Sequence, residues 1–314
     1  MLNYISKRLL ALIPVIIISA IIAFFITNIM PGDPVRLMVG DFATEKQVAE
    51  MRTKLGLDRP IYERFGGWLG NVAKGDLGES LFLHEPVTKA IFDRLEPTLL
   101  LAVVGMFFGI VIGIPLGIIA AMKHRTIFDQ LAISTSLIGM TIPSFFIAII
   151  LILVFGVNLQ WFPVAGYEPY SKAGFGVIRF LVMPGFAIGL MQSALIARMT
   201  RSAMLDVLGQ DYIRTARAKG LSEFKVILPH AFKNSLNPIV TVIGFSLATL
   251  LGGTWIIETV FNIPGVGALA IKAILNRDYP LIQGSLIFTV VIYLLVNLLV
   301  DISYSFINPY IKYK

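Results

Sequence analysis

Six long apolar segments limit what this chain can fold into. Each is close to the ~20 residues that a helix needs to cross a bilayer core about 30 Å thick. The segments are continuous apolar runs rather than alternating patterns, so they predict helices and not the strands of a barrel. We therefore expect an all-α integral membrane protein with six transmembrane helices. They cover Leu9–Met30, Thr98–Met122, Leu131–Val157, Phe180–Ala197, Ser235–Val260 and Leu281–Val300.

The composition agrees with a membrane protein. Hydrophobic residues make up 56% of the chain, charged residues only 14%, and the mean hydropathy is +0.81. Soluble domains average about 25% charged residues, so a water-soluble fold would lack the polar surface to cover such a core. The chain has no cysteine, which excludes disulfides, thiolate metal sites and cysteine nucleophiles.

The first apolar segment begins like a secretory signal peptide, because Lys7 and Arg8 precede it. A signal-peptide core spans roughly 7–15 residues and ends at an A-x-A-like cleavage site. This segment runs for 22 residues, and no such site follows it. We therefore expect residues 1–30 to be retained as an N-terminal transmembrane helix.

Basic residues predict the orientation. Lys123, His124 and Arg125 lie in the short loop between the second and third segments, and seven Lys and Arg residues lie in the loop 198–234. Both termini are basic as well, and all four regions share one side if the helices alternate. The positive-inside rule makes that side the cytoplasm. Both termini, including a tail at 309–314, are therefore predicted to be cytoplasmic.

Residues 31–97 form the longest loop and are predicted to lie outside. The loop holds nine Lys and Arg against eleven Asp and Glu, so it has no basic excess. Thr44–Leu55 has helical spacing, and prolines and glycines interrupt the rest. We expect a small extracytoplasmic cap of short helices, followed by a five-helix core over residues 98–308.

Small residues recur every four positions in three of the segments. Examples are Gly105, Gly109, Gly113 and Gly117, which share one helix face. Such faces allow helix backbones to approach closely. They serve either static packing or surfaces that slide during transport, and the sequence does not separate the two.

Polar residues at two places in the apolar segments are candidates for a pathway or gate. Pro143 interrupts the third segment between Thr141 and Ser144, so polar groups gather at an expected kink. Glu258 lies near the outer end of the fifth segment and Asp301 near the inner end of the sixth. For Thr141 and Ser144, the alternative is that their hydroxyls satisfy the backbone groups freed at the kink. For Glu258 and Asp301, the alternative is interfacial anchoring, because both lie near helix ends within reach of water.

The loop 198–234 has the pattern of short helices with one apolar side. Leu205, Leu208, Tyr212 and Ile213 are expected to be buried. Arg214, Arg217 and Lys219 would face away, and Ala216, Ala218 and Gly220 would give a low surface for close approach. Such a surface suits docking into a groove of another protein. The alternative is an ordinary solvated basic loop.

Several motifs extend this picture over nearly the whole chain. They read PGDP (Pro31–Pro34), LGLDRPIYERF (Leu55–Phe65), GDLGES (Gly75–Ser80), TIPSF (Thr141–Phe145), RTARAKG (Arg214–Gly220), GGTWIIETVFNIPGVG (Gly252–Gly267), NRDYPLIQG (Asn276–Gly284) and NLLVD (Asn297–Asp301). In this order and spacing they resemble the permeases of ATP-binding-cassette (ABC) importers, specifically the B-type subunit of the dipeptide/oligopeptide/nickel family. The resemblance implies a type I importer permease fold.

The resemblance also implies a role for the loop 198–234. In the family this loop inserts into a cleft of the ATPase subunit. The implied coupling residues are Asp211, Tyr212, Arg214, Thr215, Ala216, Arg217, Ala218, Lys219 and Gly220. The family's Glu-Ala-Ala falls on Arg214, Thr215 and Ala216, so the glutamate is absent, as is typical of the peptide branch. A downstream proline position falls on Lys233.

The implied machinery has several chains in a bacterial or archaeal cytoplasmic membrane. They are a second homologous permease forming a heterodimer, two ATP-binding subunits and an extracytoplasmic substrate-binding protein. The sequence has no G-x-x-x-x-G-K-[ST] loop, so ATP and Mg are expected on the partner subunits, and no cofactor or metal on this chain. The implied cargo is a di- or oligopeptide; glutathione or a nickel chelate is the alternative.

Functions of other classes fit the sequence less well. A stand-alone secondary transporter or channel would need its own ion-coupling set, and the apolar segments carry few carboxylates. An intramembrane enzyme is disfavoured because H-E-x-x-H and G-x-S-x-G motifs are absent. Nucleic-acid binding is disfavoured because acids are interleaved in the short basic loop.

Overall fold

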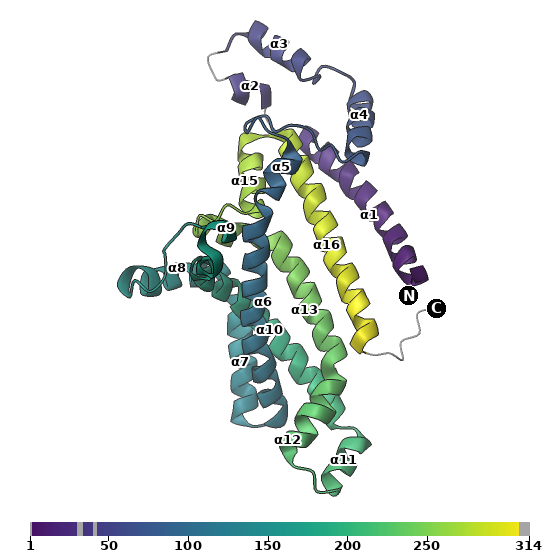
Figure 1. Ribbon diagram of the computed structural model, residues 1–314, viewed down its shortest axis with the longest axis vertical. Coiled ribbons are helices and arrows are strands. Elements are labelled where there is room, and N and C mark those ends of the chain that lie inside the picture. Colours follow the sequence, from purple (N-terminus) through teal and green to yellow (C-terminus); the bar gives the residue numbers. More distant parts are fainter. Residues whose placement is uncertain (1, 30–33, 40–42, 308–314) are drawn as a thin grey trace. The chain divides into compact units, whose positions relative to one another are not determined.

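The computed structural model describes residues 2–29, 34–39 and 43–307, and this part of the chain is helical without a β-strand (Figure 1). Part of the PGDP motif and the predicted cytoplasmic tail at 309–314 lie outside the described residues. The chain divides into two compact units. One unit comprises Met1–Glu96 and Pro264–Leu294, and the other comprises Pro97–Ile263 and Leu295–Lys314.

The first unit begins with a long apolar helix and continues through the predicted cap. Its helices are α1 (Leu2–Ile29), α2 (Pro34–Val39), α3 (Glu45–Lys54), α4 (Ile61–Ala73), α5 (Val87–Phe92), α15 (Val266–Asn276) and the start of α16 (Tyr279–Ile307). The short helices expected between residues 31 and 97 are therefore present, and their position outside the membrane stays a prediction. A capping box explains where α3 begins: the Thr44 hydroxyl accepts from the Gln47 N–H, and the Gln47 side chain accepts from the Thr44 N–H.

Distant parts of the sequence meet in the core of this unit. Phe24 of α1 packs against Phe65 and Trp68 of α4, with ring centroids 5.2 and 5.4 Å away. Asp278 lies just before α16, where its carboxylate accepts from the Leu281 N–H as a helix cap. The same carboxylate accepts from the Ser80 hydroxyl at 2.5 Å. Two of the sequence motifs, GDLGES and NRDYPLIQG, are thus joined by one buried hydrogen bond.

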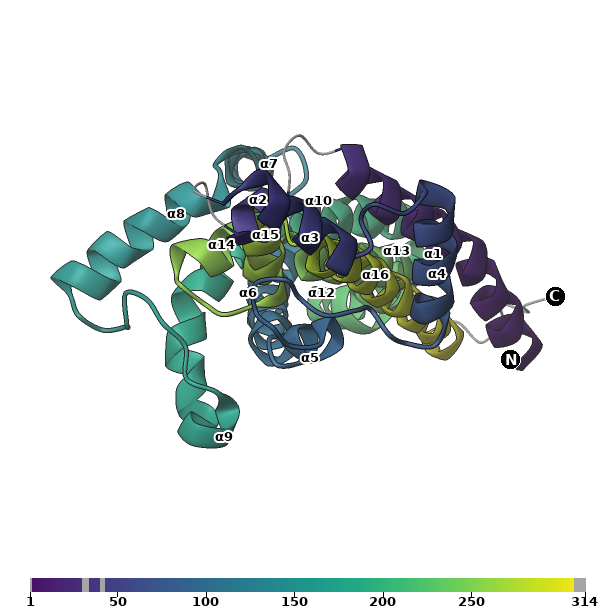
Figure 2. The same cartoon turned by 90° about the horizontal axis from the view of Figure 1, so that it is seen from above.

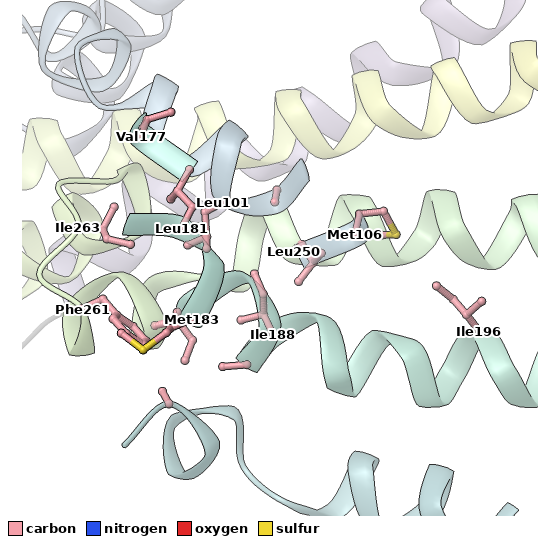
Figure 3. Close-up of a cluster of buried hydrophobic side chains, with 14 of the residues drawn as sticks. Leu101, Met106, Val177, Leu181, Met183, Ile188, Ile196, Leu250, Phe261 and Ile263 are labelled. Atoms are coloured by element: carbon pink, nitrogen blue, oxygen red, sulfur yellow. The ribbon is translucent and has the colours of Figure 1, made fainter. Parts of the chain in front are cut away.

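The second unit contains most of the remaining helices. They are α6 (Leu95–Met122), α7 (Ile127–Thr141), α8 (Ser144–Leu151) with the π-helical η1 (Ile152–Asn158), α9 (Tyr170–Ala173) with the 3₁₀ turn η2 (Gly174–Val177), α10 (Ile178–Leu208), α11 (Asp211–Ala218), α12 (Glu223–Lys225) with the π-helical η3 (Val226–Phe232), α13 (Lys233–Gly253) and α14 (Trp255–Val260). Its main apolar core joins side chains of α6, α8, α10, α13 and α14, among them Leu101, Ile188 and Leu250 (Figure 3).

Two ridges of small residues bring α6 and α10 together. A methyl group added to Gly113 would lie 2.6 Å from the Ser193 carbonyl oxygen, and one added to Gly189 would lie 2.5 Å from that of Gly105. Real Cβ atoms do not approach carbonyl oxygens so closely, so only glycine permits this helix spacing. The ridges predicted in the second and fourth apolar segments therefore face each other.

Among the residues that the structure describes, five helical segments are long and apolar enough to cross a membrane: Arg8–Ile29, Val87–Met122, Tyr170–Leu208, Glu223–Gly253 and Tyr279–Ile302. A sixth span exists if α7 and the α8–η1 segment count as one, although they are bent by 93° (Figures 1 and 2). The kink expected at Pro143 within Leu131–Val157 is present, and it is a sharp bend at which one helix ends and another begins. Pro143 donates no N–H and keeps Ile142 extended, so α7 ends at Thr141 and α8 starts in a new direction.

The helix in the fifth predicted segment is shorter than expected. The helix α13 ends at Gly253, and α14 follows as a separate piece, so Ser235–Val260 is not one helix. The predicted division of the chain at residues 30, 97 and 308 stays a prediction, because the two compact units reflect contacts and not sides of a membrane.

Candidate coupling loop and buried polar sites

The predicted coupling residues form one short amphipathic helix and the turn after it. Gln210 is extended and precedes α11, and Lys219 ends it. Gly220 then has a positive φ of +77°, which reverses the chain before α12. This left-handed conformation costs other L-residues about 1 kcal/mol or more. The glycine of the RTARAKG motif therefore has a local structural reason.

Two buried side chains hold α11 on the rest of its unit. Ile213 and Ala216 lie three positions apart, and both join an apolar cluster with Met204 of α10, Ala121 of α6 and Val226 of η3. The ends of α6 and α10 and the segment η3 that precedes α13 therefore share one packing centre. A displacement of α11 would act on all three of these elements.

The sequence prediction for this helix is partly wrong. Tyr212 is exposed instead of buried, and its hydroxyl accepts a hydrogen bond from the Asn234 amide at 3.1 Å. Ala216 is buried instead of contributing to the exposed low surface. On a helix, residue 213 shares its inner face with 216 and not with 212, because neighbours diverge by about 100°. Ala218 and Gly220 are exposed, as expected.

The exposed face of this helix is charged. Arg214, Arg217 and Lys219 point away from the apolar cluster. Arg217 pairs with Glu223 through two hydrogen bonds of 2.9 and 3.2 Å, which brace the turn around Gly220. Arg214 approaches Asp211 within 3.6 Å, and the Thr215 hydroxyl donates to the Asp211 carbonyl. The face therefore presents hydrogen-bond donors and positive charge to its surroundings.

The three gate candidates of the third segment lie at the sharp bend. The Thr141 hydroxyl donates to the Leu137 carbonyl at 2.8 Å, so it satisfies a backbone group at the end of α7. Pro143 is the residue before α8, and Ser144 is its first residue. A pathway role for these residues stays a prediction.

Glu258 is in a different environment from the one expected. It was predicted to lie within reach of water, but its side chain is fully buried at 0% exposure. One carboxylate oxygen accepts from the Thr98 hydroxyl at 2.7 Å and from the Thr254 hydroxyl at 2.9 Å. It thereby links α14 to the start of α6. The sequence did not indicate this burial because Thr98 is 160 positions away.

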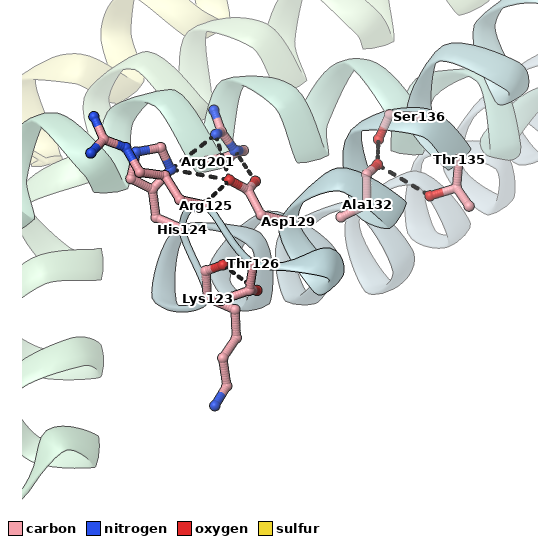
Figure 4. A network of polar contacts seen from close by, with 9 residues as sticks. All are labelled: Lys123, His124, Arg125, Thr126, Asp129, Ala132, Thr135, Ser136 and Arg201. Carbon is pink, nitrogen blue, oxygen red and sulfur yellow. Dashed lines mark hydrogen bonds and ion pairs between the residues drawn. The ribbon is translucent and has the colours of Figure 1, made fainter.

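A second buried carboxylate was missed altogether. Asp129, at the start of α7, accepts two hydrogen bonds from Arg201 of α10, Nε–Oδ1 at 2.5 Å and Nη2–Oδ2 at 2.9 Å (Figure 4). His124 and the Arg125 backbone N–H also contact its Oδ2, each at 3.0 Å. The available sequence signal for this site was a single acid, Asp129, shortly after three basic residues. The network ties the α6–α7 turn to α10, one turn before the residues that hold α11.

Within the described residues, no three His, Cys, Asp or Glu side chains come together as a metal site would require. The buried carboxylates of Glu258 and Asp129 are instead hydrogen-bonded to side chains of their own unit. The described geometry is that of helices joined by buried hydrogen bonds, with one charged helix projecting from a packed base.

Two family descriptions match almost the whole chain. Residues 113–313 match the family described as "Binding-protein-dependent transport system inner membrane component", and residues 1–102 match its N-terminal counterpart, "Binding-prot-dependent transport system membrane comp, N-term". The first match begins and the second ends within α6, and residues 103–112 lie between them. The family descriptions themselves name an inner-membrane component of a transport system that depends on a binding protein.

Curated relatives are similar over their full length. A "Putative peptide transport system permease protein" of Brucella abortus (strain 2308) is 43% identical over 309 residues, which cover 98% of each chain. A "Glutathione transport system permease protein" of Escherichia coli (strain K12) is 39% identical over 314 residues, which cover 100% of each chain. The family resemblance inferred from the motifs is therefore confirmed.

Solved structures support the fold. The inward-facing MetNI methionine ABC transporter includes a chain that matches with a TM-score of 0.57 at 19% identity, covering 70% of this chain and 97% of that one. A likeness at this identity bears on the fold alone, and it confirms the predicted type I importer permease architecture. The chain belongs to the family of binding-protein-dependent transport system inner-membrane components, and it is a multi-pass membrane permease.

Proposed function

We propose that this chain is one of two permease subunits of an ATP-driven ABC importer, and that its cargo is a short peptide. The carrying observation is the full-length similarity to permeases named for peptide and glutathione transport, at 43% and 39% identity. Glutathione is itself a tripeptide, so both names point to small amide-linked molecules with free carboxylates. Import of glutathione is the second candidate.

The partners follow from the family and from the shape of α11. A binding protein would deliver the peptide on the extracytoplasmic side, and a second permease would complete the pathway. Two ATPase subunits would receive the charged face of α11, where Arg214 and Lys219 are exposed. ATP and Mg would be bound by those subunits. Helix-in-groove docking of this kind uses an amphipathic helix with one buried and one presented face.

The mechanism would use the packing of α11. Closure of the ATPase subunits would push α11, and Ile213 and Ala216 would pass the displacement to the ends of α6 and α10. Such a push would drive a rigid-body change between outward- and inward-facing states. The Asp129–Arg201 pair would make the α6–α7 turn move together with α10.

Reconstitution of the complete transporter tests the proposal. The chain, its partner permease, the ATPases and the binding protein are placed in proteoliposomes, and uptake of a labelled tripeptide is measured with and without ATP. We expect ATP-dependent uptake that also requires the binding protein. Uptake without ATP, driven by an ion gradient, would contradict the proposal and favour a secondary transporter. Competition by glutathione distinguishes the two cargo candidates.

A further inference from the structure

A cavity of about 720 Å³ lies within the unit formed by residues 1–96 and 264–294. Its walls come from α1, the end of α3 and the turn after it, α4, the segment 79–84 and the start of α16. Small-molecule sites usually measure roughly 300–1,000 Å³. The cavity therefore has the size of a site for a short peptide.

The wall of the cavity combines aromatic side chains with two polar side chains that are held by buried hydrogen bonds. Phe24, Trp68 and Tyr279 line the cavity. Ser80, which also lines it, is fixed by Asp278, and Gln283 donates to the Thr27 hydroxyl at 2.8 Å. Such a wall is preorganised to accept an apolar side chain, because its rings do not need to be ordered on binding.

Arg64 is the group in the cavity that most needs a partner. Its guanidinium is half-buried and lies 6.0 Å above the Phe24 ring. No carboxylate of the described residues forms an ion pair with it. Burial lowers the pKa of Arg64, which marks a desolvated charge without a compensating anion. Arginine offers a planar fork suited to a carboxylate.

The other charged side chains that line the cavity include both positive and negative groups. Lys54 and Arg59 line it, and neither forms an ion pair among the described residues. Glu63 and Glu79 also line it, and the structure gives no ion pair for either. A ligand that carries both a carboxylate and an ammonium group would complement this lining, whereas a purely anionic or purely cationic one would meet a like charge.

We propose that this cavity is a binding site for a short zwitterionic peptide, with Arg64 receiving the C-terminal carboxylate and the aromatic wall receiving a side chain. The inference rests on the proposed function, because it takes the same cargo class. It adds an extracytoplasmic binding site to the permease, separate from any pathway between two permease subunits. The concave lining, to which five segments contribute, favours a small molecule over a flat protein surface.

Binding to the full-length chain in lipid nanodiscs tests the site. The probes are trialanine and trialanine amide, which lacks the carboxylate, and the measurement is isothermal titration calorimetry. We expect saturable binding of trialanine and at least about tenfold weaker binding of the amide, since a charge-assisted pair is lost. Equal affinities for the two probes, or no saturable binding of trialanine, would overturn the site.

Variants assign the carboxylate to Arg64. Arg64→Gln should weaken trialanine binding to the level of the amide, and Arg64→Lys should fall between, because it keeps the charge but loses the fork. Lys74→Gln is the matched control: Lys74 ends α4, is exposed and does not line the cavity. Unchanged trialanine affinity in Arg64→Gln would contradict the assignment. The same holds if Arg64→Gln keeps its trialanine affinity but no longer binds the substrate-binding protein. That result would indicate that Arg64 contacts an acidic group of the binding protein instead.

The failure of this site differs from the failure of the proposed function. If wild-type proteoliposomes show ATP-dependent peptide uptake while the isolated permease binds no trialanine, the cavity inference is wrong and the transport function stands. If trialanine binds but uptake does not depend on ATP, the transport proposal is wrong and the site stands.

Discussion

Glu258 shows how one buried carboxylate can join two helices. Its Oε1 accepts from the hydroxyls of Thr98 and Thr254, and its side chain has no exposed surface. A buried donor that loses its acceptor costs about 1–3 kcal/mol. The residue therefore contributes to stability whether or not it also contributes to a transport pathway.

Two substitutions separate shape from charge at this residue. Glu258→Gln keeps an oxygen that accepts from both hydroxyls, so we expect a melting temperature near that of the wild type. Glu258→Ala leaves two buried donors without this acceptor and should lower the melting temperature by several degrees. Thermal unfolding of the purified chain in detergent checks both, and equal melting temperatures would show that the two hydrogen bonds contribute little.

Gly220 allows a test of the coupling assignment with little effect on folding. Its φ is +77°, and a methyl group placed there would meet nothing within 4 Å. Gly220→Val should therefore strain only the turn, because β-branched residues are strongly disfavoured at positive φ. We expect normal membrane insertion but less peptide imported per ATP hydrolysed. Gly209→Val, at a residue with φ of −76°, is the control. Full coupling in Gly220→Val would remove the role assigned to this turn.

The Asp129–Arg201 pair acts on the scale of whole elements, because it joins the α6–α7 turn to α10 across 72 positions. Removing one partner of a buried pair costs on the order of 3 kcal/mol, and without Arg201 the buried Asp129 carboxylate would keep only its contacts with His124 and the Arg125 N–H. Arg201→Gln should therefore lower the melting temperature markedly. Arg198→Gln, an exposed position on the same helix, should change it little. Similar melting temperatures for the two variants would argue against the pair as a structural link.

The contact of α6 with α10 gives a second prediction on this scale. Gly113→Ala would place a methyl group 2.6 Å from the Ser193 carbonyl oxygen, so the helices must separate. Overpacking of this kind costs typically about 1–3 kcal/mol. Gly253→Ala is the matched control, because nothing lies within 4 Å of its added methyl group. In thermal unfolding, Gly113→Ala should have a lower melting temperature than the wild type, and Gly253→Ala should have a melting temperature equal to or higher than that of the wild type. The opposite order would contradict the tight helix contact.

For the molecule as a whole, the sequence predicted most of what depends on local pattern. The apolar runs predicted the spanning helices, Thr44–Leu55 predicted α3, and the glycine spacing predicted the close helix faces. Local pattern did not predict the burial of Glu258, since its partner Thr98 lies in another segment. Nor did it predict Asp278 with Ser80, 198 positions apart.

The bends in the chain could be predicted only in part, because local sequence gives their positions and tertiary contacts give their angles. Pro143 indicated a kink from its chemistry alone, because it removes one hydrogen bond of the helix. The angle of 93° depends on where α8 packs, which is set by tertiary contacts with α10 and α14. The buried face of α11 likewise differs from the expected one, because Ala216 and not Tyr212 is buried with Ile213, and the partners Val226 and Met204 come from outside the helix.

Orientation in the membrane is the remaining prediction for the whole molecule, and cysteine labelling tests it directly. The chain has no native cysteine, so each introduced thiol reports on one site. Lys74 at the end of α4 and Lys219 at the end of α11 are both exposed, which makes them accessible without disturbing a core. If the basic loops are cytoplasmic, a membrane-impermeant maleimide added to intact cells should label Lys74→Cys and leave Lys219→Cys unmodified until the membrane is opened. The reverse pattern would place α11 outside, where no ATPase could reach it, and would contradict the coupling proposal together with the predicted topology.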